Sequence, residues 1–282
     1  MRKGLGLVVG AILAVYLAGI GYLFLFQRSY VFHPSGALAE PEGLGLTGIE
    51  AVTIQAKDGT TLTGWYGAAA AGRPTVLYFH GNAGNLSGRA ERFRQIQASG
   101  FGVLAVSYRG FPGSGGAPSE AGLFADALEI YDWLLERTKD IVIHGESLGT
   151  GVGTYVAAER SVSALILEAP YTAALDIAAE TYPWVPVSWL MRDPFVTRKH
   201  IRRVEEPVLI VHGTLDRVVP VEHGRRLYDT AGEPKQIAIV EGARHDDLWD
   251  RGLWPTVLEF LRANGATVQA PAAVRAAPST AG

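Results

Sequence analysis

Apolar and polar positions divide the chain into two unlike parts. Residues 4–27, GLGLVVGAILAVYLAGIGYLFLFQ, carry no charge and are almost wholly apolar. About 20 such residues span the hydrocarbon core of a bilayer as a helix. From about residue 51 the pattern changes to short apolar runs, typical of buried strands, which alternate with stretches of helical periodicity. The sequence therefore predicts an N-terminal transmembrane helix followed by an α/β domain.

The apolar run favours an uncleaved membrane anchor, residues 1–28, over a signal peptide. A signal-peptide core is usually about 7–15 residues long and precedes a cleavage site of small residues. This run is longer and ends in bulky side chains, Leu23 to Phe26. Because Arg2 and Lys3 precede the run, the positive-inside rule places the N-terminus in the cytoplasm. We therefore predict a single-pass membrane protein whose larger domain lies on the extracytoplasmic (periplasmic) side.

The pattern beyond the anchor predicts an α/β fold with a mostly parallel central sheet. Val52–Ala56 and Leu62–Tyr66 flank Lys57-Asp58-Gly59-Thr60, which is a hairpin signal. Further strands are expected at 75–80, 102–108, 140–146, 163–169, 207–213 and 236–242, and helices at 88–99, 119–137, 148–160, 221–230 and 247–263. Apolar strands that are each followed by a helix are typical of a parallel sheet with helices on both faces.

Three segments follow the anchor. Residues 29–50, rich in Gly and Pro, are interpreted as a linker, and residues 51–263 as the α/β domain. That domain contains an insertion at about 170–205, where a small cap would sit. Residues 264–282, rich in Ala, Pro and Gly, are predicted to be a disordered tail.

Composition excludes several classes of function. The chain of 282 residues has no cysteine, so disulfides, thiol nucleophiles and thiolate metal sites are absent. Its net charge of −3 gives no basic field for a nucleic-acid partner. It contains neither a phosphate-binding G-x-x-x-x-G-K-[ST] motif nor a zinc-binding H-E-x-x-H motif. We expect no cofactor and no metal, and the oligomeric state stays open.

One pentapeptide organises the candidate chemistry: Gly145-Glu146-Ser147-Leu148-Gly149. It lies between an apolar strand and a predicted helix, which is the strand–turn–helix context of a nucleophile elbow. The glycines allow a strained, crowded turn, and the serine oxygen then projects from the carboxyl ends of the strands. Ser147 is the candidate nucleophile.

A serine hydroxyl needs a base to remove its proton and an acid to orient that base. With such an elbow the chain order is serine, acid, histidine. Asp216 directly follows the strand at 207–213, and His245 directly follows the strand at 236–242. Loops at the carboxyl edge of the sheet would therefore carry both residues. Glu168, at the end of the strand at 163–169, is the alternative acid.

An oxyanion hole needs two backbone N–H donors. One is expected from the residue after the nucleophile, Leu148, and the other from the loop after the strand at 75–80. That loop reads HGNAGN, residues 80–85, in which the N–H of Asn82 is the first candidate and that of Ala83 the second.

The insertion carries the candidate substrate-binding residues. It is broken by prolines and rich in large apolar side chains. Such residues could line an acyl pocket, touch lipid or pack onto the body of the domain. We assign Tyr171, Trp184, Trp189 and Met191 to substrate binding. His245-Asp246-Asp247 is interpreted as a base followed by helix-capping acids, not as a metal site.

Together these motifs resemble the α/β-hydrolase superfamily. The resemblance rests on HGNAGN, SYRGFPGSGGAPSE, GESLG, EAPYTAALDIAA, HGTLDRVVP and the late histidine. More closely, they resemble its membrane-anchored serine hydrolases, the branch labelled serine-aminopeptidase-like or alpha/beta-hydrolase-domain protein. The resemblance implies a Ser147–His245–Asp216 triad that hydrolyses a small-molecule or lipid acyl substrate without a cofactor. An ester is the expected substrate and a thioester is possible; a peptidase or amidase, or a non-catalytic interaction protein, is the alternative.

Overall fold

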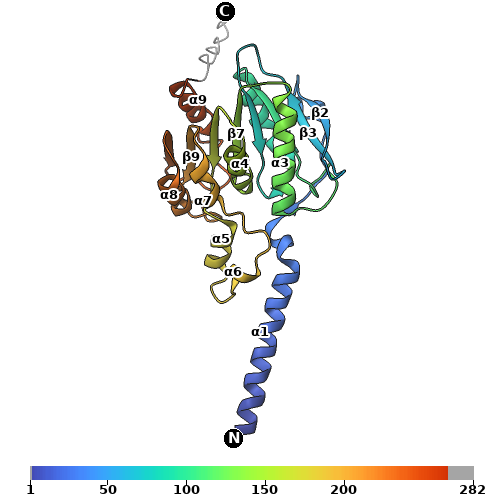
Figure 1. Ribbon diagram of the computed structural model, residues 1–282, viewed down its shortest axis with the longest axis vertical. Coiled ribbons are helices and arrows are strands. Elements are labelled where there is room, and N and C mark those ends of the chain that lie inside the picture. Colours follow the sequence, from blue (N-terminus) through green and yellow to red (C-terminus); the bar gives the residue numbers. More distant parts are fainter. Residues whose placement is uncertain (1, 266–282) are drawn as a thin grey trace, which may run out of the picture.

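An eight-stranded sheet runs through the body of the protein in the computed structural model, which describes residues 2–265 (Figure 1). Its strands are β2 (Glu50–Gln55), β3 (Thr61–Gly67), β4 (Thr75–Phe79), β6 (Gly102–Val106), β7 (Ile141–Glu146), β8 (Ala164–Glu168), β9 (Val208–Gly213) and β10 (Lys235–Val240). Their spatial order is β10-β9-β8-β7-β4-β6-β3-β2. The hairpin β2–β3 is antiparallel, β3 is antiparallel to β6, and the other neighbours are parallel. The predicted mostly parallel sheet is confirmed.

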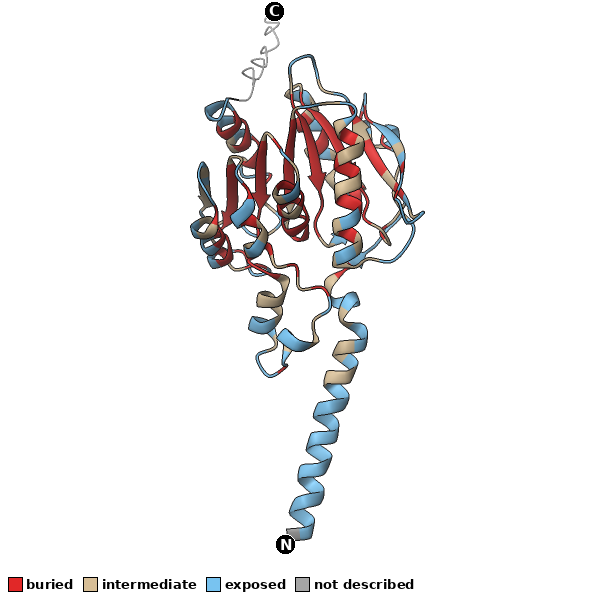
Figure 2. Ribbon diagram, viewed as in Figure 1, coloured by how far each residue is buried: buried red, intermediate tan, exposed pale blue. Residues whose placement is uncertain are grey.

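Helices cover both faces of this sheet because its central strands are apolar on both sides. The covering helices are α2 (Ala90–Ala98), α3 (Glu120–Leu135), α4 (Leu148–Glu159), α8 (Val221–Thr230) and α9 (Leu253–Ala263). In β4, Leu77 and Phe79 belong to the core on the side of α3, α4 and α8, whereas Val76 and Tyr78 belong to the core on the side of α2 and α9. Figure 2 shows the central strands as buried. This alternation follows from the two-residue period of a strand.

The final helix is shorter than predicted. It begins at Leu253 instead of near residue 247. Residues 248–252 form turns, and Gly252 has a φ of 92°, which a right-handed helix does not accommodate. Asp247 accepts a hydrogen bond from the backbone N–H of Arg244 (2.7 Å), which holds the segment before the helix as a turn.

The insertion forms a small cap below the sheet. It contains α5 (Ala174–Thr181), α6 (Val187–Leu190) and α7 (Thr197–His200), followed by a 3₁₀ turn at Ile201–Arg203. The N-terminal helix α1 (Arg2–Val31) leaves the body on the side where α5 and α6 lie (Figure 1). The cap and α1 are therefore neighbours in space although about 150 residues separate them in the sequence.

Helix α1 is long and apolar enough to cross a membrane, and most of its length is exposed. It continues to Val31, three residues beyond the predicted end of the anchor. The segment after it is not a free linker, because β1 (His33–Pro34) pairs in parallel with β5 (Ala83–Gly84). Two further 3₁₀ turns lie at Glu42–Leu44 and Leu86–Arg89. The predicted disordered tail lies outside the described residues from position 266 onward.

Candidate active site

Ser147 occupies a strained turn between β7 and α4. Its φ and ψ are 49° and −114°, a backbone conformation that a residue with a side chain rarely adopts. Neighbouring backbone also requires the two glycines: a Cβ on Gly149 would lie 2.0 Å from the carbonyl oxygen of Phe79, and one on Gly145 would lie 2.5 Å from that of Gly149. The first turn of α4 thus packs directly on the end of β4, where the HGNAGN loop begins.

His245 and Asp216 are in hydrogen-bond contact with this serine. The Nε2 atom of His245 lies 2.9 Å from Ser147 Oγ, and Nδ1 lies 2.7 Å from Asp216 Oδ2. An ionised carboxylate can only accept, so Nδ1 carries the proton and Nε2 of the neutral ring is free to accept from the serine. The sheet order explains the arrangement, since β7, β9 and β10 end at the same edge.

The surroundings of Asp216 keep it charged. Its Oδ1 accepts hydrogen bonds from the backbone N–H groups of Val218 and Val219, each at 2.8 Å. Burial alone would favour the neutral acid, but the hydrogen bonds from His212, His245 and Val219 outweigh it and lower the pKa of Asp216. A fixed negative charge therefore lies beside Nδ1 of His245.

That charge acts on His245 in turn. Burial disfavours the imidazolium, but the hydrogen bond and the charge of Asp216 outweigh burial, so that the pKa of His245 is raised above its ordinary value. The imidazolium that would form when Ser147 gives up its proton is thereby stabilised.

Glu168, the alternative acid, lies in a different network. Its Oε2 accepts from Arg92 (3.1 Å) and lies 3.1 Å from Nε2 of His144. It is fully buried at the end of β8. Asp216, and not Glu168, contacts Nδ1 of His245, so this geometry favours Asp216 as the acid.

Leu148 and Asn82, the residues expected to supply the oxyanion donors, both line the pocket beside Ser147. Leu148 is the first residue of α4, where a backbone N–H has no carbonyl partner within the helix. Asn82 lines the pocket with Leu148 and Ser147, whereas Ala83 is exposed and belongs to the short strand β5. The structure therefore favours Asn82 over Ala83.

Arg89 connects the two segments that carry the candidate oxyanion donors. It was not predicted from the sequence. Its guanidinium donates to both carboxylate oxygens of Glu146 at 3.0 Å, and to the carbonyl oxygens of Ala83 (2.9 Å) and Asn85 (3.0 Å). Arg89 thus bridges the residue before the nucleophile and the HGNAGN loop. Arginines near a helix start are usually exposed, so no sequence pattern marked this one.

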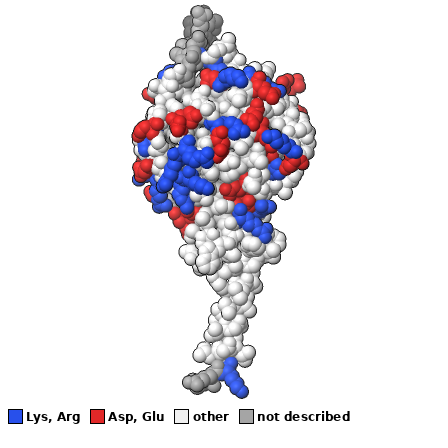
Figure 3. Space-filling model, viewed as in Figure 1, with Lys and Arg blue, Asp and Glu red and all other residues white. Residues whose placement is uncertain are grey.

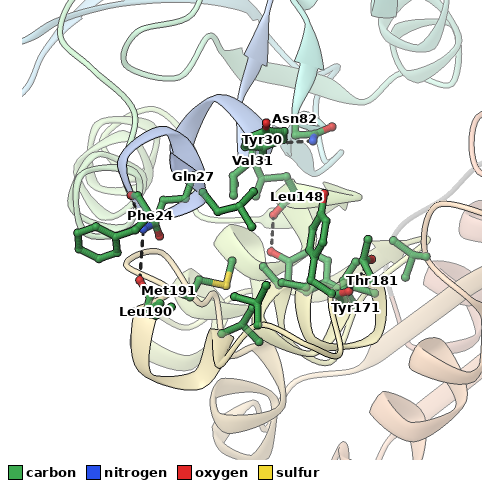
Figure 4. Close-up of a pocket in the computed structure, with 18 of the residues that line it drawn as sticks. Phe24, Gln27, Tyr30, Val31, Asn82, Leu148, Tyr171, Thr181, Leu190 and Met191 are labelled. Carbon is green, nitrogen blue, oxygen red and sulfur yellow. Dashed lines mark hydrogen bonds between the residues drawn. The ribbon is translucent and has the colours of Figure 1, made fainter. Parts of the chain in front are cut away.

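A pocket of about 330 Å³ opens at Ser147 (Figure 4). The structure places Tyr171 and Met191 in its lining, and the Tyr171 hydroxyl donates to the carbonyl oxygen of Leu148 (3.1 Å). Trp184 and Trp189 are a correction to the predicted substrate-binding set: they lie outside the pocket, 57% and 89% exposed. Trp184 lies in the turn before α6, and Trp189 lies on the exposed side of α6.

The N-terminal helix supplies a whole side of the pocket, which the sequence did not predict. These lining residues of α1 are called the helix wall: Ile20, Leu23, Phe24, Gln27, Tyr30 and Val31. Figure 4 shows the helix wall opposite the cap, with Asn82 donating from Nδ2 to the carbonyl oxygen of Val31 (3.0 Å). None of the pocket-lining residues in the described part of the chain carries a charge at neutral pH. Within residues 2–265 no cluster of three or more His, Asp or Glu side chains could hold a metal ion.

Comparisons with known proteins match this architecture. Residues 74–197 match the alpha/beta hydrolase fold family, and residues 196–252 match the family of serine aminopeptidase, S33. The alpha/beta hydrolase domain-containing protein WAV2 of Arabidopsis thaliana is 33% identical over 281 residues, which cover 88% of this chain and 91% of that protein.

Two further proteins are similar over smaller parts or at lower identity. The lysophosphatidylserine lipase ABHD12 of Rattus norvegicus is 36% identical over 232 residues, 70% of this chain and 58% of that protein. Among solved structures, the esterase Pf2001 of Pyrococcus furiosus superposes with a TM-score of 0.69 at 19% identity, covering 83% of this chain and 98% of that one. The last likeness concerns the fold alone.

Proposed function

The chain belongs to the α/β-hydrolase family, and on that premise we propose that it is a membrane-anchored serine hydrolase that cleaves carboxylic esters. One observation carries the proposal: hydrogen bonds of 2.9 and 2.7 Å link Ser147, His245 and Asp216 at the end of an uncharged pocket. The lipase name of the similar protein ABHD12 supports hydrolysis of an ester.

In the proposed mechanism, His245 takes the proton of Ser147 as Oγ attacks the acyl carbonyl. Asp216 holds the ring in the required tautomer and stabilises the imidazolium. The backbone N–H groups of Leu148 and Asn82 bind the oxyanion, and each such donor typically contributes about 2.7–4 kcal/mol to stabilisation of the transition state. His245 then protonates the leaving alcohol and activates the water that releases the acid from the acyl-enzyme.

The pocket favours an acyl chain over a peptide. An aminopeptidase must compensate the charge of a substrate α-amino group, and no pocket-lining residue of the described chain is an acid. The match to serine aminopeptidase, S33, nonetheless keeps amide hydrolysis by the same triad as the second candidate. An ester and an amide with the same acyl group, assayed side by side, distinguish the two; a thioester of that acid completes the series.

The membrane part of the proposal rests on α1. Its length and apolar character fit a single span, and Lys3 at its start fits a cytoplasmic N-terminus. The catalytic domain would then lie on the extracytoplasmic side. A reporter fused to the C-terminus and active only outside the cytoplasm is the expected result; cytoplasmic reporter activity would reverse this orientation.

Labelling with a fluorophosphonate probe tests the nucleophile. The wild-type protein should be labelled and Ser147→Ala should not, because the probe phosphonylates only an activated serine. Ser161→Ala, at an exposed serine, is the matched control and should be labelled like the wild type. Labelling that persists in Ser147→Ala would refute the assignment, and an unlabelled wild type would favour a non-catalytic interaction protein.

A further inference from the structure

The last third of α1 is docked on the cap by polar contacts. Gln27 donates from Nε2 to the carbonyl oxygen of Leu190 (3.2 Å) and accepts at Oε1 from the backbone N–H of Arg192 (2.7 Å). Arg28 forms an ion pair with Asp193 (2.8 Å), whose side chain is buried. A simple tether needs none of these contacts, which fix both the rotation and the height of the helix against the cap.

Those contacts set the depth of the cap in a bilayer. Tyr16, near the middle of α1, donates from its hydroxyl to the carbonyl oxygen of Trp184 in the cap (2.8 Å). At about 1.5 Å per residue, Tyr16 lies about 18 Å along the helix from Gly4. A hydrocarbon core is about 30 Å thick. If the core begins near Gly4, Trp184 lies about 12 Å inside its opposite boundary.

The lowest part of the pocket also reaches the hydrocarbon core. By the same rise, Ile20 and Leu23 of the helix wall lie about 24 and 29 Å from Gly4, within the hydrocarbon of the leaflet next to the body. The Tyr16 hydroxyl also supplies the donor that a backbone carbonyl requires at that depth. The pocket therefore lies between two elements, α1 and the cap, that both enter this leaflet.

The outer surface of the cap suits this position. Figure 3 shows an uncharged surface over the lower cap and α1, in contrast to the many charges over the body. Trp184 and Trp189, which do not reach the pocket, are exposed there. Transfer of large apolar side chains from water into lipid is favourable, so both tryptophans suit a position inside the leaflet.

We propose that α1 is part of the substrate site, and that the acyl chain of a bilayer lipid enters the pocket sideways between α1 and the cap. The helix wall then determines which length of acyl chain fits, while the ester group reaches Ser147 at the membrane surface. This inference rests on the proposed ester hydrolysis, and it makes Leu23 a specificity-determining residue of the helix that anchors the protein.

The test compares two leucines on opposite sides of α1. Leu23 lines the pocket, whereas Leu25 is 69% exposed and does not. In the full chain in detergent micelles, Leu23→Trp should lower the ratio of kcat/KM for p-nitrophenyl dodecanoate to that for p-nitrophenyl acetate at least tenfold, because the larger ring fills the path of the long chain. Leu25→Trp should leave the ratio within twofold of the wild type.

An unchanged ratio in Leu23→Trp, or an equal change in Leu25→Trp, would overturn the inference. If Leu23→Trp does not fold, Leu23→Ala replaces it and should shift the preference toward longer chains; no shift would overturn the inference as well. A wild type that hydrolyses neither ester and takes no fluorophosphonate would instead refute the proposed function, so the two failures are distinguishable.

The absence of native cysteines allows a test of depth that does not depend on catalysis. In phosphatidylcholine nanodiscs, Trp184→Cys should react at least tenfold more slowly with a membrane-impermeant maleimide than Ser161→Cys, which lies on the body. Detergent micelles with short chains should reduce this difference. Equal rates in nanodiscs would place the cap outside the bilayer and refute entry from the side.

Discussion

Two sides of one pocket are built by different means. The residues of the proposed active site, Asn82, Ser147, Leu148, Asp216 and His245, are called the catalytic floor here. They are held by backbone geometry and by hydrogen bonds of 2.7–2.9 Å to buried or partly buried groups. The helix wall is held to the cap by a few contacts between segments more than 160 residues apart, and to the HGNAGN loop by the hydrogen bond from Asn82 to Val31. The catalytic floor lies in loops and at a helix start at the carboxyl edge of the sheet, whereas the helix wall belongs to a helix that packs against the cap.

This difference assigns separate tasks to the two sides. Chemistry requires atoms placed to within a few tenths of an ångström, which a strained turn at the end of a buried strand provides. Selection of the acyl chain requires an apolar surface of suitable shape, which two elements packed side by side can provide. We therefore expect substitutions in the catalytic floor to lower the rate for all substrates equally. Substitutions in the helix wall should change the preference for acyl-chain length.

Asp216→Asn should have the largest effect. The amide places the wrong tautomer of His245 beside Ser147, and kcat should fall about 10⁴-fold for acetate and dodecanoate esters alike. Glu168→Gln is the comparison, since Glu168 contacts Arg92 and His144, and its activity should stay within about tenfold of the wild type. A larger loss of kcat in Glu168→Gln than in Asp216→Asn would show that Glu168, and not Asp216, is the acid.

Gly149→Ala should have the second-largest effect on kcat. Its Cβ would lie 2.0 Å from the carbonyl oxygen of Phe79, so the first turn of α4 must move and carry the Leu148 N–H away from the oxyanion. A displaced donor costs about 10²–10³-fold in kcat. Gly43→Ala, where a Cβ has open space, is the control for the glycine change itself. Steady-state kinetics and thermal unfolding would be measured together, and full activity in Gly149→Ala would contradict the steric argument.

The pH dependence is the smallest of these effects. His245 must be neutral to accept the serine proton, and Asp216 raises the pKa of His245. Activity should therefore fall on acidification with a midpoint above about 6.5, the ordinary histidine value, by about tenfold per pH unit below the midpoint. The kcat/KM profile between pH 5 and 8 should have the same midpoint for both chain lengths. Different midpoints for the two esters would mean that the helix wall influences the pKa of His245 in the catalytic floor.

The spatial proximity of the residues in the catalytic floor could be predicted from the sequence, whereas their roles stay predictions. Ser147, Asp216 and His245 each follow an apolar strand, and the carboxyl ends of parallel strands share one edge, so strand order alone brings them together. The same local reasoning finds Leu148 and Asn82, because each has a fixed place relative to a strand end. It also predicts that helices cover both faces of the sheet, because runs such as the one at 75–80 are apolar along most of their length.

The helix wall could not be predicted in this way. An apolar helix has the same pattern whether lipid or a protein pocket surrounds it, so nothing distinguishes Leu23 from Leu25 in the sequence. The outward direction of Trp184 and Trp189 was hidden for a similar reason, since large apolar residues in a proline-broken segment fit a pocket or a membrane equally. Arg89 was missed because its partners, Glu146 and the loop carbonyls, come together only in the folded chain.

The ion pair between Arg28 and Asp193 has a consequence for biosynthesis. Helix α1 leaves the ribosome well before the cap and would be in the membrane while the rest of the chain is still being made. The cap then meets a helix already in place, and Asp193 gains its cation at that moment. Under the proposed function, a chain that fails to insert would hold the proposed triad beside an incomplete pocket, and long-chain ester hydrolysis should therefore require the inserted chain.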